Sequence, residues 1–206
     1  MLDDSELERY MRHILLREVG GAGQQKLKNA KVVVIGAGGL GAPVLLYLAA
    51  AGVGCLGIVD DDTVALSNLQ RQIIHKTSNI DLEKTLSARE TLQEINPHVK
   101  INLHNCRITA KNALEIISGY DIVVDGSDNF PTRYLMNDAC YFACKPLVSA
   151  AVGQFDGQIT TFRAYEVGSD GTLNPNYRCL YPQAPPPGTV PTCEEAGIIG
   201  ALTGIL

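Results

Sequence analysis

Gly36, Gly38 and Gly41 follow one another at a fixed spacing within residues 32–41, VVVIGAGGLG. A β-branched apolar run precedes them, and an apolar helical pattern follows them. In such a strand–turn–helix the first glycine permits a tight turn, the second lets a phosphate approach the backbone, and the third lets the helix pack against the strand. The helix N-terminus presents N–H groups and a partial positive charge to an anion. The spacing predicts a phosphate-binding turn, tightened by Gly39; a purely structural turn is the alternative.

Polar side chains that could complete such a site occur further along the chain. Asp60 ends the second predicted strand, 24 residues after the first glycine, where dinucleotide-binding folds place the acid that binds ribose. The segment 67–72, Ser-Asn-Leu-Gln-Arg-Gln, adds Asn68 and Arg71 just beyond that strand. Lys84 lies near the start of a predicted helix, and Asp128 follows a later strand.

Two kinds of chemistry use a glycine turn of this type, and the charged residues help to separate them. Hydride transfer to a nicotinamide needs an apolar slot and few cations, whereas triphosphate chemistry needs cations on the phosphate oxygens and a carboxylate for Mg²⁺. Arg71, Lys84 and Asp128 supply the second set. Each alone has a simpler explanation: a solvated cation, or, for Asp128, the cap of the next helix. Their joint occurrence favours ATP, and an NAD-binding oxidoreductase is the alternative.

Strands and helices alternate along the chain at a spacing that is typical of a parallel sheet with helices on both faces. The predicted strands are 31–35, 55–59, 99–103, 120–125 and 146–152, and the predicted helices are 5–18, 40–51, 81–95, 110–117 and 134–143. Residues 157–164 predict an antiparallel extension at the C-terminal side, and 165–192 a long loop. We expect a Rossmann-like, doubly wound α/β fold whose strand ends gather the candidate side chains.

Two of these helices carry more detailed expectations. Ser5 and Glu8 predict a capping box at the start of the first helix. The apolar face of the helix at 81–95 is predicted to consist of Leu82, Leu86, Leu92 and Ile95. Lys84 lies off that face, so we expect its ammonium group to point sideways.

Composition sets limits on the class of protein. The 206 residues suffice for a single domain, 1–206, with a sizeable core. A net charge of −5 argues against a broad nucleic-acid surface, no apolar run has membrane-spanning length, and the acidic start argues against a signal peptide. We expect a cytoplasmic protein. Residues 197–206 are apolar and end without a cap, so an element cut short, and with it a truncated, non-catalytic nucleotide-binding remnant, is a further alternative.

The sequence resembles the ThiF/MoeB/HesA group of ubiquitin-activating-like (E1-like) adenylyltransferases, and within it the MoeB type. The matching stretches are Arg9–Leu15, Gly36–Gly41, Asp60–Gln72, Lys84, Asp125–Asn129 and Thr192–Gly197. The resemblance implies ATP-dependent adenylation of the C-terminal glycine of a small ubiquitin-like sulfur carrier (MoaD/ThiS type, ending in Gly-Gly), in molybdopterin or thiamin biosynthesis. It also implies a homodimer.

The resemblance further implies a role for each candidate residue. Gly36, Gly38, Gly39 and Gly41 would surround the phosphates, and Asp60 would bind the ribose hydroxyls. Catalysis would involve five residues, namely Arg12, Arg71, Lys84, Asp128 and Cys193.

Among these, Asn68, Arg71 and Lys84 would bind the triphosphate, Asp128 would hold Mg²⁺, and Arg12 would reach the γ-phosphate in the partner subunit's site. A terminal carboxylate has a pKa of about 3.3–3.7 and is already ionised at neutral pH, so the reaction needs no general base. Catalysis then consists of positioning the reactants and neutralising their charge.

Cysteine positions bear on sulfur chemistry and on zinc. Cys193 is the family's candidate for sulfur transfer, but Glu194 and Glu195 would raise its pKa if they face it, and an inert loop cysteine is the alternative. A separate rhodanese-type or cysteine-desulfurase donor would then supply the sulfur. Many family members bind zinc through two Cys-x-x-Cys pairs; here the first pair begins with Asn176 in place of a cysteine, and no second pair follows, so zinc is not expected. Cys55 and Cys140 are predicted to be core thiols.

Overall fold

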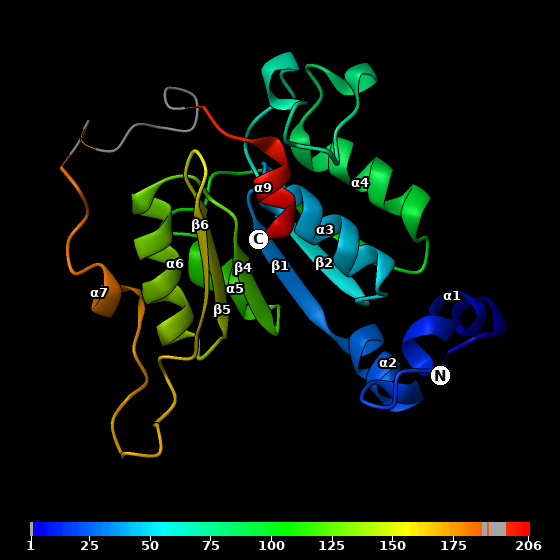
Figure 1. Ribbon diagram of the computed structural model, residues 1–206, viewed down its shortest axis with the longest axis horizontal. Helices are drawn as coiled ribbons and strands as arrows, with labels where there is room; N and C mark the ends of the chain where they lie inside the picture. The colour runs from blue at the N-terminus through cyan, green and yellow to red at the C-terminus, as the bar shows by residue number, and fades with distance from the viewer. Residues whose placement is uncertain (1, 187–188, 190–196) are drawn as a thin grey trace.

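The computed structural model describes residues 2–186, 189 and 197–206. Within these ranges six strands form one sheet in the order β3-β2-β1-β4-β5-β6 (Figure 1). The strands are β1 (Lys31–Ile35), β2 (Cys55–Val59), β3 (Lys100–His104), β4 (Ile122–Asp125), β5 (Leu147–Val152) and β6 (Gly157–Phe162). Neighbouring strands are parallel except β5 and β6, which are antiparallel. The doubly wound sheet and its antiparallel extension are therefore confirmed.

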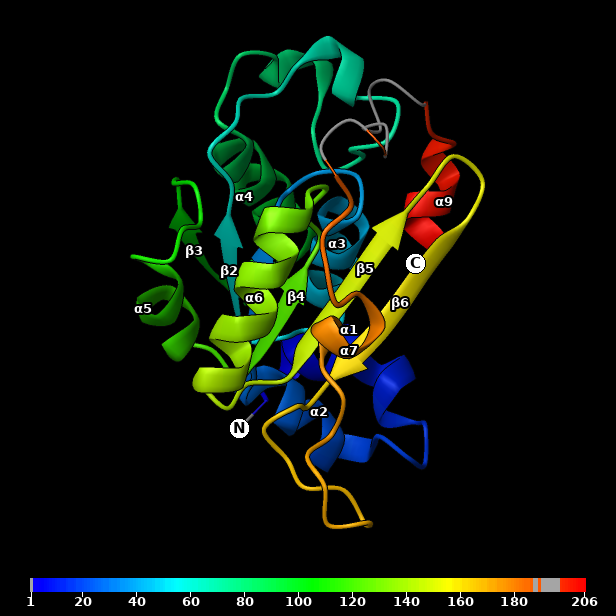
Figure 2. The same ribbon diagram turned by 90° about the vertical axis from the view of Figure 1, so that its left-hand side faces the viewer.

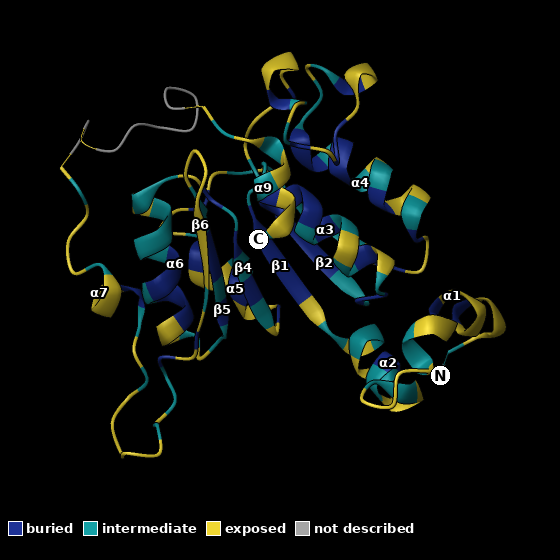
Figure 3. Ribbon diagram, in the orientation of Figure 1, coloured by how far each residue is buried: buried dark blue, intermediate teal, exposed yellow. Residues whose placement is uncertain are grey.

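Helices cover both faces of this sheet (Figure 2). The helices of the described residues are α1 (Asp4–Ile14), α2 (Gly20–Asn29), α3 (Gly41–Ala50), α4 (Lys84–Ile95), α5 (Ala113–Ser118), α6 (Phe130–Phe142), α7 (Tyr177–Leu180) and α9 (Gly200–Ile205). Because successive side chains of a strand point to opposite faces, β1 contributes to two cores. Val32 and Val34 pack with residues of α3 and α4, whereas Val33 and Ile35 pack with residues of α5 and α6. Burial is accordingly concentrated in the central strands (Figure 3).

The first helix differs from its prediction at both ends. Its N-cap is Asp3, whose carboxylate accepts the N–H of Glu6, while the Glu6 carboxylate accepts the N–H of Asp3, both at 2.9 Å. The predicted box of Ser5 and Glu8 is wrong, because the helix begins earlier and Glu6 is buried against Lys28, 2.6 Å away. The helix ends at Ile14, and a second helix, α2, which the pattern did not predict, leads into β1.

The predicted helix at 81–95 begins at Lys84, because Asp81 adopts a positive φ of 70°. Its buried residues are Lys84, Thr85, Ser87, Ala88 and Leu92, whereas Leu86 and Ile95 are half-buried. The predicted apolar face is wrong except for Leu92, because this face of α4 carries small and polar side chains. The Lys84 side chain is largely buried, and its Nζ lies 2.8 Å from Asp62 Oδ2.

Two further segments were predicted incompletely. The helix expected at 134–143 begins at Phe130, directly after its N-cap Asn129, whose side chain accepts the N–H of Thr132 at 3.0 Å. The long loop at 165–192 contains the single-turn helix α7. The helix α9 lies in the apolar segment 197–206, which the pattern did not assign to a helix or a strand.

Candidate nucleotide-binding site

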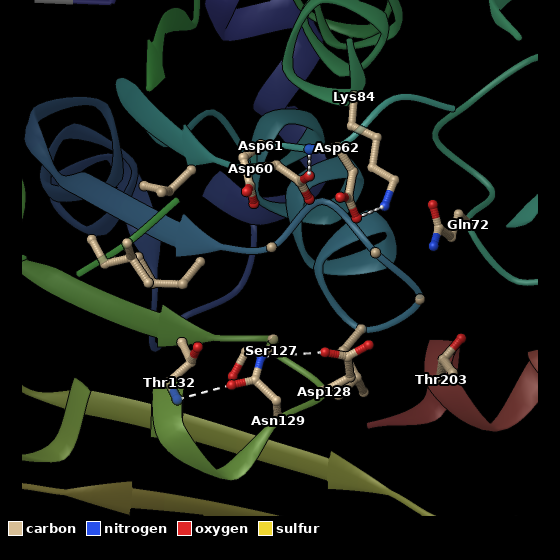
Figure 4. A pocket seen from close by; sticks show the side chains of 18 of the residues that line it. Asp60, Asp61, Asp62, Gln72, Lys84, Ser127, Asp128, Asn129, Thr132 and Thr203 are labelled. Carbon is tan, nitrogen blue, oxygen red and sulfur yellow. Dashed lines mark hydrogen bonds and ion pairs between the residues drawn. The ribbon is translucent and has the colours of Figure 1, made fainter. Parts of the chain in front are cut away.

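A pocket of about 290 Å³ opens where β1, β2 and β4 end. Seven of the predicted site residues line it, namely Gly36, Gly38, Gly39, Asp60, Arg71, Lys84 and Asp128. These residues come from five separate parts of the chain, and the parallel sheet brings them to one edge because the carboxyl ends of its strands coincide. Figure 4 shows the acidic run 60–62 with Lys84 on one side of the glycine turn and Asp128 on the other.

The glycine turn has the shape that the spacing predicts. Gly36 has a φ of 90°, in the left-handed region that favours glycine, and its N–H donates to Val59 O at 2.8 Å. A Cβ on Gly41 would lie 1.8 Å from the carbonyl oxygen of Gly36, so only glycine fits there. Gly41 does not line the pocket, and its role in the structure is to let α3 pack against the turn.

The N-terminus of α3 faces this pocket through Gly38, Gly39 and Leu40. Leu40 is the N-cap, and no side chain of the described residues caps the helix there. The first N–H groups of a helix lack intrahelical partners, and the helix dipole adds partial positive charge. This end of α3 can therefore accept an anionic group.

Asp60 both lines the pocket and supports the turn. Its carboxylate accepts the N–H of Ala37 at 2.8 Å and the N–H of Asp62 at 2.9 Å. Burial raises the pKa of Asp60, and the charge of Lys84 partly opposes this. Carboxylate oxygens of Asp60, Asp61 and Asp62 lie within 4.8 Å of one another. The sequence prediction used only the first of these three acids.

The two candidate cations lie on different elements. Lys84 Nζ lies 2.8 Å from Asp62 Oδ2, so the ammonium is paired with an acid at the pocket wall. Arg71 is half-buried, and its Nη1 donates to Ser67 O at 3.1 Å. Asn68 is buried but does not line the pocket: its side chain accepts the N–H of Ala65 at 3.2 Å and so caps the short 3₁₀ helix Leu66–Asn68. Its proposed phosphate contact stays a prediction.

Asp128 follows β4 and is exposed at the pocket. The simpler explanation, that it caps the next helix, is wrong, because Asn129 is the N-cap of α6. The Nδ2 of Asn129 donates to Asp128 Oδ1 at 3.4 Å, and this is a long contact. The Asp128 carboxylate is therefore not committed to a strong interaction among the described residues.

Several residues of the pocket were missed as site candidates. Gln72 is 5% exposed, and its Oε1 has no hydrogen-bond partner within the described ranges; Ser127 Oγ is in the same situation. Thr203 of α9 also lines the pocket and lies 3.2 Å from where a Cβ on Gly39 would stand. Gln72 belongs to the polar segment 67–72, which was the available signal. Unpartnered buried polar atoms fit a pocket that receives a polar ligand.

Two predicted residues lie outside this pocket. Arg12 is exposed on α1, and α1 and α2 lie at the opposite end of the strands (Figures 1 and 2). Arg12 therefore does not reach the pocket of its own chain. Cys193 lies outside the described residues, and its role stays a prediction.

Of the other cysteines, Cys140 is buried, as expected of a core thiol, and Cys55 is half-buried. Burial, with a smaller contribution from the charge of Asp125, raises the pKa of Cys140 to about 12. The side chain of Asn176 accepts the N–H groups of Arg178 and Cys179, at 2.9 and 3.2 Å, and so caps α7. Asn176 thus has a structural role as the N-cap of α7, and the expected lack of zinc stays a prediction.

Among the described residues, no helix is both long and apolar enough to span a bilayer.

Comparisons with known proteins give a consistent result. The model of the ThiF family matches residues 10–206. The sulfur carrier protein adenylyltransferase of Thermus thermophilus is 52% identical over 201 residues, which cover 98% of this chain and 73% of that protein. The probable adenylyltransferase/sulfurtransferase MoeZ of Mycobacterium tuberculosis is 51% identical over 201 residues, covering 98% of this chain and 50% of MoeZ. The chain thus spans about half the length of MoeZ.

Solved structures show the same fold. The structure of E. coli MccB with MccA-N7isoASN has a TM-score of 0.79 and 23% identity, over 98% of this chain and 61% of that one. The E. coli tRNA N6-threonylcarbamoyladenosine dehydratase TcdA, in complex with ATP, has a TM-score of 0.68 and 27% identity, over 72% of this chain and 61% of that one.

Proposed function

The chain belongs to the ThiF family of E1-like adenylyltransferases, and on this premise we propose that it transfers AMP from ATP to the C-terminal glycine of a small ubiquitin-like sulfur carrier. One observation carries the proposal. Arg71, Lys84 and Asp128 meet around an uncapped helix N-terminus in one pocket, at the edge of a parallel sheet.

The pocket offers a separate place for each part of ATP. The N–H groups at the start of α3 suit the phosphates, and the carboxylate of Asp60 suits the ribose hydroxyls. Val59 and Ile108 supply apolar surface for the base. The unpartnered Oε1 of Gln72 adds a buried polar atom that a ligand can satisfy.

The reaction follows from charge. The carboxylate of the carrier's terminal glycine attacks the α-phosphorus of ATP; an acyl–phosphate bond forms, the bond between the α-phosphorus and the bridging oxygen breaks, and pyrophosphate leaves. Because the nucleophile is already an anion, the barrier is repulsion between negative groups. Arg71 and Lys84 lower it by placing positive charge beside the phosphates. When ATP binds, the ammonium group of Lys84 must leave the Asp62 carboxylate and contact phosphate oxygens. Because Asp62 is exposed, breaking this ion pair costs little free energy.

We propose that Asp128 holds Mg²⁺, because its carboxylate is exposed at the pocket and has only one long contact within the described ranges. The ion, when bound, neutralises phosphate charge. Oxygen ligands are those that Mg²⁺ prefers. We propose no zinc site, since Asn176 is a poor zinc ligand and caps α7.

We also propose that the active unit is a homodimer. Met11, Leu15 and Leu16 expose 43%, 68% and 53% of their surface on and just after α1, next to Arg12. An apolar surface of this kind is typical of an interface. Packing it against a second copy would carry Arg12 towards the γ-phosphate in the partner's pocket. The single domain over 1–206, the sulfur donor, the role of Cys193, the molybdopterin or thiamin pathway and the cytoplasmic location stay predictions.

Pyrophosphate exchange tests the proposal. The protein should exchange labelled pyrophosphate into ATP only when a carrier ending in Gly-Gly is present. Arg71→Ala and Lys84→Ala should each lower the exchange rate about a hundredfold or more. Arg163→Ala is the matched control, because Arg163 is exposed and does not line the pocket. Exchange at the wild-type rate in both pocket variants would refute the mechanism.

The same preparation distinguishes the two alternatives. The chain has no tryptophan, so enhancement of NADH fluorescence on binding would be easy to see. Binding of NADH without binding of ATP would favour the oxidoreductase. Binding of ATP without exchange, across a panel of carriers, would favour a non-catalytic nucleotide-binding protein.

A further inference from the structure

His75 joins the glycine turn to the helix that carries Lys84. The imidazole is 6% exposed, with Nε2 3.0 Å from Ala37 O and Nδ1 2.9 Å from Ser87 Oγ. Ala37 lies between the first two glycines of the turn, and Ser87 lies on α4, three residues after Lys84. One side chain therefore bridges two elements of the candidate site.

The partners of His75 determine its protonation. A carbonyl oxygen can only accept, so Nε2 carries the proton that is donated to Ala37. In the neutral imidazole Nδ1 has no proton and accepts from the Ser87 hydroxyl. Burial lowers the pKa of His75, and the nearby charge of Lys84 lowers it further, whereas the bond to Ala37 raises it. The structure thus favours a neutral ring with one defined tautomer.

The bond to Ala37 also orients a peptide group. Ala37 is held on both sides, since its N–H donates to Asp60 at 2.8 Å and its carbonyl oxygen accepts from His75. The peptide that joins Ala37 to Gly38 is trans, so the Gly38 N–H points opposite to the Ala37 carbonyl. It therefore points away from His75, and Gly38 lines the pocket.

We infer that His75 is a positioning residue for nucleotide binding. Its bond to Ala37 fixes the Ala37–Gly38 peptide so that the Gly38 N–H is available to a phosphate. Its bond to Ser87 holds this peptide at a fixed position relative to the helix that carries Lys84. The inference rests on the proposed function, because it requires the pocket to bind a nucleotide. His75 touches no substrate in this role and acts through the backbone.

Calorimetry with ATP on four variants tests this role. His75→Leu removes both hydrogen bonds at similar volume and should weaken ATP binding about tenfold or more. His75→Gln keeps an N–H that can reach Ala37, so it should restore most of the affinity. Ser87→Ala should weaken binding by a smaller factor. A His75→Leu/Ser87→Ala double variant should lose no more than His75→Leu alone, because the two residues act as one unit.

His104→Leu is the matched control. The His104 side chain is a half-buried imidazole whose Nε2 lies 2.8 Å from the Tyr120 hydroxyl. The main-chain oxygen of His104 accepts the N–H of Asp60 at 3.3 Å, but neither the imidazole nor Tyr120 lines the pocket. The His104→Leu variant should bind ATP with the affinity of the wild type, even if the substitution lowers its melting temperature. Wild-type affinity in His75→Leu, or equal weakening in His75→Leu and His104→Leu, would overturn the inference. If the wild-type protein itself binds no ATP, the proposed function fails instead.

A spectroscopic measurement on the unaltered protein covers the case in which His75→Leu does not fold. Nitrogen-15 NMR of the imidazole rings should show His75 as a neutral ring protonated at Nε2 at pH 7. A ring protonated at Nδ1, or at both nitrogens, would contradict the bond to Ala37 and overturn the inference, independently of ATP.

Discussion

Lys84 Nζ lies 2.8 Å from Asp62 Oδ2, and the two side chains differ sharply in exposure: 7% for Lys84 and 68% for Asp62. A nearly buried ammonium is thus balanced by a carboxylate that water reaches. An exposed partner contributes little to folding, because solvent screens the interaction. The same partner competes with an incoming phosphate for the ammonium group.

Removing this competition should strengthen nucleotide binding. Asp62→Asn leaves Lys84 without its carboxylate and takes one negative charge from a pocket that receives a polyanion. We expect ATP to bind several-fold more tightly, roughly the effect of a surface ion pair of about 1 kcal/mol, with a small decrease in melting temperature. Calorimetry and thermal unfolding measure the two effects. Weaker binding of ATP by Asp62→Asn would show that Asp62 supports the ligand and does not compete with it.

Two glycines of one turn should respond differently to alanine. A Cβ on Gly41 would lie 1.8 Å from Gly36 O, so Gly41→Ala should destabilise the fold by about 3 kcal/mol. A Cβ on Gly38 would have Gln72 Nε2 as its nearest neighbour, at 3.8 Å. Gly38→Ala should therefore fold normally but bind ATP poorly, because the methyl group enters the pocket. Denaturant unfolding and calorimetry separate the two effects, and a strongly destabilised Gly38→Ala would argue against this assignment.

Two imidazoles should make stability depend on pH. Burial lowers the pKa values of His75 and His104 below the usual 6.5. Below that pH the unfolded chain binds more protons than the folded one, so the free energy of unfolding should fall as the pH is lowered from about 7 towards 5.5, by at most about 1.4 kcal/mol per pH unit and group.

Denaturant titrations at several pH values measure this dependence. The decrease should be smaller in His75→Gln and in His104→Gln than in the wild type. His98→Gln is the control, because His98 is exposed. A wild-type stability that does not change between pH 7 and 5.5 would contradict the lowered pKa values of both rings.

The thiols should differ in reactivity. Cys140 is buried and its pKa is raised to about 12, whereas Cys144 and Cys179 are exposed. Because the thiolate is the reactive form, a maleimide or disulfide reagent at pH 7.5 should modify Cys144 and Cys179 rapidly and Cys140 only after unfolding. Peptide mass spectrometry of the native protein identifies the modified sites. Rapid modification of native Cys140 would be incompatible with its place in the core.

Much of this fold could be predicted because it depends on neighbours in the chain. The strands at 31–35 and 55–59 were predicted to the residue, since β-branched apolar runs bounded by turns are local signals. Gly36 and Gly41 marked the phosphate turn for the same reason: a tight turn restricts residue type at a few consecutive positions. Because a parallel sheet aligns its strand ends, the sequence also placed Asp60 and Asp128 at one edge.

Helix details required the tertiary structure. The N-cap Asp3 was missed because Ser5 and Glu8 have an equally good local pattern, and the choice depends on burying Glu6 beside Lys28 of α2. Leu86 and Ile95 were predicted on the buried face of α4, since an apolar stripe was the best available guide, but both are half-buried. Small and polar residues of α4 are buried there instead, and one of them, Ser87, contacts His75.

By itself the sequence determined which residues could do chemistry and which edge of the sheet would gather them, because spacing and strand order follow from the covalent chain. Only the folded chain decided which atoms meet. Asp62 pairs with Lys84, which is 22 residues away in the chain, and His75 bonds to Ala37, which is 38 residues away. No local sequence pattern encodes either contact. Such contacts depend on how helices pack on a sheet and on which rotamers that packing leaves open.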